Sequence, residues 1–122
     1  MSSDRIYDYR TIGFIAHTST VTVTATVPEV MVGHIPYARY SIGGQTATIT
    51  VKLMQERLGT VTGTLDVVTL TPAKPTIPET AGKIDDVVAI VDPGHKVVAV
   101  TTTGSVEGKI IFGYMYGRTR RA

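Results

Sequence analysis

The chain of 122 residues contains no cysteine and no tryptophan. The lack of cysteine excludes disulfide bonds, thiol catalysis, zinc–thiolate sites and iron–sulfur clusters. Charged residues are also scarce, at 18% against roughly 25% in an average soluble domain. No stretch approaches the ~20 apolar residues of a membrane-spanning helix, and the first ten residues are polar and mixed in charge, unlike an export signal. We therefore expect one domain that folds in a reducing cytoplasm and is used without membrane insertion.

The low charge content leaves two interpretations of the surface. With 43% hydrophobic residues, the chain is either a β domain whose polar face is threonine, or a protein that hides part of its surface against a partner. The net charge of +2 is too small to favour nucleic acid as that partner. The densest charge is a C-terminal tail formed by Arg118, Arg120 and Arg121. This tail is either a tether to an acidic surface or a solvated terminus.

Threonine and valine alternate along residues 18–27, and the pattern returns at residues 46–53. Alternation with a period of two, in β-branched residues, indicates strands with one buried and one solvent-facing side. Further strands are expected at 34–42, 60–71, 83–91, 96–103 and 105–116, with a tight turn at 92–94. One short helix is predicted at 54–58, capped by Gly59. About eight strands at this spacing predict an all-β fold, an antiparallel β-sandwich of the jelly-roll kind.

Two strands break the alternation. In residues 60–71 the apolar positions change from odd to even between Val67 and Val68, which predicts a β-bulge or bend near these residues. In the last strand the even positions are apolar throughout, whereas the odd positions change from charged residues to Ile111 and Met115. An antiparallel sheet commonly keeps one face polar. We therefore expect Ile111 and Met115 to be covered by the N-terminal arm, by a loop or by another subunit.

No pattern of catalytic or ligand-binding residues is present. The histidines, His17, His34 and His95, show no metal-ligand spacing. Asp85 and Asp86 are neighbours in an expected strand, so their carboxylates would point to opposite faces. The sequence also has no P-loop, dinucleotide fingerprint or nucleophile elbow. We predict no catalytic residue, no cofactor and no metal site.

The chain divides into a polar arm at 1–10, a β domain at 11–117 and a basic tail at 118–122. The stretch before this tail is VVAVTTTGSVEGKIIFGYMYG, where a valine-rich strand and a glycine turn precede a strand with alternate aromatics, Phe112, Tyr114 and Tyr116. In this stretch, and elsewhere in architecture, the chain resembles the small jelly-roll cement, or decoration, proteins of tailed bacteriophages.

The resemblance implies a non-enzymatic protein on the capsid surface of the virion, made in the host cytoplasm. Such a protein binds the assembled shell, often as a homotrimer, and staples major capsid subunits together, with no role for membrane or nucleic acid. On this basis the arm and the tail would contact the capsid through Tyr7, Tyr9, Arg10, Arg118, Arg120 and Arg121. Ile111 and Met115 would make the contact between subunits.

Three other classes remain open. The chain could be another phage structural domain, from a tail, baseplate or head fibre. It could be a soluble carbohydrate- or ligand-binding β-sandwich, although several of its aromatics lie within expected strands, including Tyr37, Tyr40, Tyr114 and Tyr116. An enzyme on a cupin-like barrel would need clustered histidines and a carboxylate around a metal, which the sequence does not display.

Overall fold

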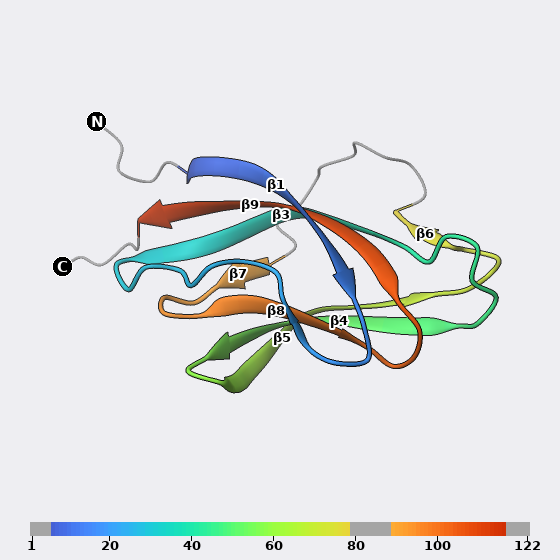
Figure 1. Ribbon diagram of the computed structural model, residues 1–122. Coiled ribbons are helices and arrows are strands. Elements are labelled where there is room, and N and C mark those ends of the chain that lie inside the picture. The colour runs from blue at the N-terminus through green and yellow to red at the C-terminus, as the bar shows by residue number, and fades with distance from the viewer. Residues whose placement is uncertain (1–5, 79–88, 117–122) are drawn as a thin grey trace.

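The structure, a computed structural model, describes residues 6–78 and 89–116. Within these residues nine strands form two antiparallel sheets that pack together as a β-sandwich (Figure 1), which confirms the predicted all-β class. Sheet A contains β1 (Ile6–Ala16), β3 (Met31–Ser41), β6 (Thr76–Ile77), β7 (Ala89–Val91) and β9 (Val106–Tyr116). Sheet B contains β2 (Val21–Thr22), β4 (Ile49–Arg57), β5 (Thr60–Leu70) and β8 (Lys96–Thr101). No helix in the described ranges is long and apolar enough to cross a membrane.

The strands pair in a nested order. β1 pairs with β9, β2 with β8, β3 with both β6 and β7, and β4 with β5. The pairs β3–β9 and β4–β8 join these ladders, giving the order β1-β9-β3-β6 in sheet A and β2-β8-β4-β5 in sheet B. The first and last strands, β1 and β9, therefore pair in sheet A. The middle strands, β4 and β5, are joined by a tight turn in sheet B.

The core lies between the sheets, where the alternation directs one side of each strand inward. Val51 and Leu53 of β4 and Ile110 of β9 are almost fully buried. Removing such side chains from water stabilises the fold by roughly 25 cal/mol per Å² of apolar surface. The Tyr40 hydroxyl of β3 donates a 2.9 Å hydrogen bond to Asp66 Oδ2 of β5, which links the sheets. Burial and the nearby Asp66 carboxylate raise the pKa of Tyr40, so the hydroxyl keeps its proton.

The first strand begins earlier than the sequence analysis placed it. Residues 6–10, assigned to the arm, belong to β1, where Ile6 is in register with Met115 and Tyr7 with Tyr114. These residues find backbone partners on the end of β9, a pairing that no local pattern reveals. Residues 1–5 and the tail at 118–122 lie outside the described residues.

The predicted helix at 54–58 is wrong. Residues 54–57 continue β4, which is hydrogen-bonded to β5 on one side and to β8 on the other. These residues are good helix formers, but helix propensity is a weak local preference, and backbone pairing on both sides outweighs it. Leu58 and Gly59 then form the turn into β5, both with positive φ, of 52° and 85°.

Two further strand predictions change. The bulge or bend expected near Val67–Val68 is displaced: the register is continuous at these two residues, and its shifts against β4 leave Leu65 and Thr62 unpaired. Only Val21–Thr22 of the 18–27 segment is strand. The turn at 92–94 is confirmed: Gly94 has φ of 78°, and the His95 amide donates to the Asp92 carbonyl at 3.2 Å. Residues 83–88 of the next expected strand lie outside the described residues.

Candidate binding face

The outer face of sheet A brings together side chains from β1, β9 and β3. The register places Thr11 of β1 opposite Ile111 of β9, and Ile111 opposite Tyr37 of β3. One row further along, Lys109 lies opposite Arg39. The change from charged to apolar odd positions along β9 therefore divides this face into two halves.

The apolar half contains a depression of about 440 Å³, which we call the apolar depression. It is lined by Tyr9, Arg10, Thr11, Pro36 and Ile111. Its walls come from two irregularities: the β1–β9 register shifts between Tyr7 and Arg10, and the β3–β9 register shifts between His34 and Tyr37. Tyr9 and Pro36 lie inside these shifts, on either side of β9. The bulges, which re-aim side chains out of the regular pleat, thus shape the depression around Ile111.

The Tyr9 wall is held in place by a histidine across the sheet. The Tyr9 hydroxyl lies 2.6 Å from Nδ1 of the buried His34, and the two ring centroids are 6.0 Å apart. The β9 residue opposite His34 is Gly113, which has no side chain to separate them. Burial lowers the pKa of His34 and raises that of Tyr9. Both directions favour the neutral forms of the two rings, and the contact with His34 holds Tyr9 in place although its side chain is 46% exposed.

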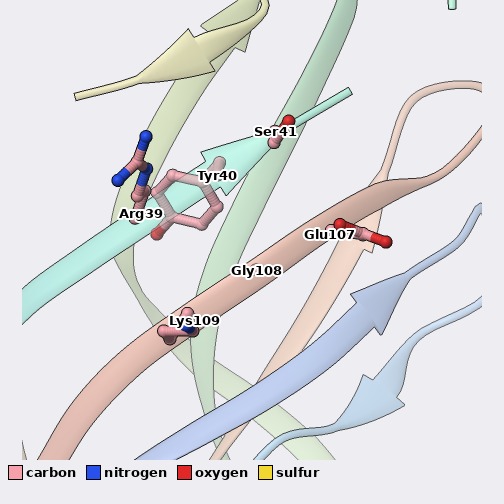
Figure 2. Close-up of a pocket in the computed structure, with 6 residues that line it drawn as sticks. All are labelled: Arg39, Tyr40, Ser41, Glu107, Gly108 and Lys109. Atoms are coloured by element: carbon pink, nitrogen blue, oxygen red, sulfur yellow. The ribbon is translucent and has the colours of Figure 1, made fainter. Parts of the chain in front are cut away.

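The charged half carries a cationic pair, Arg39 and Lys109, directly opposite one another on β3 and β9 (Figure 2). They line a shallow hollow of about 220 Å³ together with Tyr40, Ser41, Glu107 and Gly108. Like charges at directly opposed positions of a sheet destabilise it. Among the described side chains, neither cation forms a salt bridge. The pair therefore offers two donors to an acidic group from outside the chain.

His34 and His95 make local contacts in the part of the chain that is described. No group of three histidine, cysteine, aspartate or glutamate residues lies close enough there to hold a metal ion. His34 bonds to Tyr9, while His95 Nδ1 lies 3.0 Å from the Pro93 carbonyl at a turn. Asp85 and Asp86 fall outside the described residues.

The structure groups three residues for which the sequence predicted two roles. Tyr9 and Arg10, predicted to contact the capsid, line one depression with Ile111, predicted to contact another subunit. Met115 is half-buried in register with Ile6 and Val32, outside the depression lining. The side chain of Tyr7, like the tail arginines Arg118, Arg120 and Arg121, is outside the described part.

Sequence reasoning missed Pro36, Arg39 and Lys109. Lys109 shares the parity of Ile111 and was visible as a polar position of the same face. Pro36 and Arg39 could be placed there only with the register of β3 and its irregularity. Comparisons of the chain with protein-family models, curated proteins and solved structures found no match. The interpretation of this face therefore rests on its geometry and on the resemblance described above.

Proposed function

We propose that this chain is a non-enzymatic virion structural protein, a capsid decoration protein that binds the assembled shell of a bacteriophage and stabilises contacts between major capsid subunits. The observation that carries the proposal is the divided outer face of sheet A. Its cationic pair supplies charge for an acidic protein surface, and its apolar depression supplies area that is better buried. Both halves lie on one hydrogen-bonded sheet and need no rearrangement to bind.

The finer architecture is part of the proposal. The nested pairing of first strand with last, and the sheet orders β1-β9-β3-β6 and β2-β8-β4-β5, support a jelly roll. Jelly rolls occur in viral capsid proteins, lectins and cupins. A fold of this breadth does not choose among functions, so the proposal depends on the face and not on the topology.

A protein of this kind acts through linkage. A ligand that binds the assembled shell, but not its dissociated subunits, stabilises the assembled state by mass action. We propose that the chain acts as a homotrimer, because several joined copies bind a repeating surface more tightly than one copy does. In this arrangement the cationic pair faces the shell and the apolar half serves contacts between copies.

The proposal is tested by co-sedimentation of the purified chain with empty phage shells and with dissociated capsid subunits. We expect saturable binding to shells, weakened by salt because exposed charges are screened, and no binding to free subunits. The double variant R39E/K109E should bind at least about tenfold more weakly. It keeps a like-charge pair at the same positions, so its folding stability should stay close to that of the wild type. K52E is the matched control, because Lys52 is an exposed cation on the outer face of sheet B. Wild-type chain that does not sediment with shells, or an equal loss in K52E, would contradict the proposal.

A further inference from the structure

The tip of the β4–β5 hairpin presents an apolar side chain to solvent. Leu58 is 94% exposed and adopts a φ of 52°, and Gly59 follows with a φ of 85°. A two-residue hairpin turn with both φ values positive favours asparagine followed by glycine, whereas leucine rarely adopts positive φ. Leucine is thus disfavoured at this position both by its backbone conformation and by its exposure. Such an outlier is grounds for a functional hypothesis.

The tip is braced by the neighbouring loops. Arg57 Nη2 lies 3.3 Å from Glu29 Oε2, and Arg57 Nη1 donates to the Pro93 carbonyl at 3.3 Å. Gln55 Nε2 donates to Asp92 Oδ2 at 2.8 Å, and the Asp92 amide donates back to Gln55 Oε1 at 3.0 Å. These contacts tie the hairpin to the β2–β3 loop and to the β7–β8 turn. These contacts therefore hold the hairpin, and with it Leu58, in a defined position.

We propose that Leu58 of one copy inserts into the apolar depression of the next copy; this deepens the homo-oligomer of the proposed function and rests on it. The depression, at about 440 Å³, is larger than the ~150 Å³ apolar cavity that accepts a benzene molecule, so a leucine side chain fits. Glu29, which pairs with Arg57 beside the tip, keeps an exposed carboxylate that can also bond Arg10 at the lining of the depression.

The insertion has to be between molecules. The tip belongs to sheet B (Figure 1), while the residues that line the depression belong to β1, β3 and β9 of sheet A and surround Ile111 on its outer face. The tip and the apolar depression are different patches, so the contact is heterologous: each copy inserts its own tip into one neighbour and receives the tip of another. A heterologous contact closes into a ring when its rotation permits, and a three-membered ring is the state we infer.

Sedimentation equilibrium of the full chain, without shells, tests this directly. We expect a trimer for the wild type and at least a tenfold weaker association for L58N, whose thermal midpoint should equal or exceed that of the wild type. V67T is the matched control, since Val67 is 52% exposed on the outer face of sheet B, and it should stay trimeric. T11R, which places a large side chain in the apolar depression, should also dissociate the trimer. A monomeric wild type, a trimeric L58N, or equal loss in V67T would overturn the inference.

Cross-linking adds a test of position, because the chain has no cysteine of its own. L58C and T11C proteins, mixed and oxidised, should form the mixed dimer faster than either variant forms its own dimer. Equal rates for all three pairs would overturn the assignment. Recruitment of monomeric wild type to phosphatidylcholine vesicles, lost in L58N, would assign the tip to a membrane instead. A monomer that still sediments with shells would overturn the inference and the proposed homotrimer, and would leave the proposed binding to shells intact.

Discussion

The two outer faces of the sandwich use their side chains in opposite ways. On sheet B the Thr50 and Thr69 hydroxyls lie 3.0 Å apart, and Lys96 pairs with Glu56 at 3.4 Å. On sheet A two cations stand directly opposite one another, and apolar side chains line an open depression. These charged and polar groups of sheet B pair with each other, whereas on sheet A neither Arg39 nor Lys109 forms a salt bridge among the described residues. This difference is the reason for proposing the outer face of sheet A as the binding face.

The apolar depression of sheet A forms where register shifts lie on both sides of β9. Near Ile111 the ladders of β9 with β1 and with β3 both shift register, and Gly113 leaves a gap opposite His34, whereas Gly108 lies on the core side. A Cβ on Gly108 would collide with the Phe14 ring, which covers that glycine on the core side. Aromatic side chains from neighbouring strands thus reach over glycine, a device that protects weak positions in sheets.

The largest effect on self-association is expected when a carboxylate is placed on the outer face of sheet A, with a carboxylate on the outer face of sheet B as the control. I111D should weaken self-association by about 2 kcal/mol or more, roughly 30-fold, as loss of a central interface residue does. V67D on sheet B should leave association unchanged. Sedimentation equilibrium, with circular dichroism to verify folding, checks both variants. If V67D dissociated the oligomer and I111D did not, the contact between copies would have to be assigned to the outer face of sheet B.

A second substitution tests whether the sheets are held together independently of their outer faces. Y40F removes the hydroxyl that bonds Asp66 and should lower the free energy of unfolding by about 1–2 kcal/mol, because Asp66 loses its partner. Urea denaturation measures the loss, and D66N, whose amide oxygen still accepts the bond, should lose less. Self-association of folded Y40F should match that of the wild type; a weaker association would show that the faces depend on this link.

Acidification should affect sheet A before sheet B. Burial lowers the pKa of His34 below the ordinary value of 6.5, so between these two values the unfolded chain binds a proton that the folded chain does not. Stability should therefore be full above pH 6.5 and fall as the pH decreases toward the folded-state pKa. Urea midpoints at successive pH values measure this slope, which H34N should flatten. H17N, at an exposed histidine after β1, should retain it; a slope that survives H34N would contradict the assignment.

The smallest effect is expected on the threonine face. T50V removes one hydroxyl of the Thr50–Thr69 pair while keeping β-branching, so the free energy of unfolding should stay within about 0.5 kcal/mol of the wild type. Association should not change. A trimer weakened by T50V would show that the Thr50–Thr69 hydroxyl pair of sheet B takes part in contacts between copies.

The alternation in the sequence located much of the core and the exceptional face, and its limits have physical causes. Val51 and Leu53 are buried as the pattern indicates, and the parity of Ile111 placed it on the outer face. The helix at 54–58 was wrong because strand pairing on both sides overrides local propensity. Arg39 could not be paired with Lys109 because their register depends on the irregularity near Pro36. The conformation of Leu58 was hidden because leucine is not a residue from which positive φ is expected.

Hydroxyl-radical footprinting of the shell-bound chain tests the central claim most directly. Tyr9 and Val67 are nearly equally exposed in the isolated chain, at 46% and 52%, but lie on opposite faces. Relative to dilute monomer, we predict that labelling of Tyr9 falls strongly on decorated shells while labelling of Val67 does not change. Unchanged labelling of Tyr9, or protection of Val67 alone, would contradict the assignment of the outer face of sheet A as the binding face.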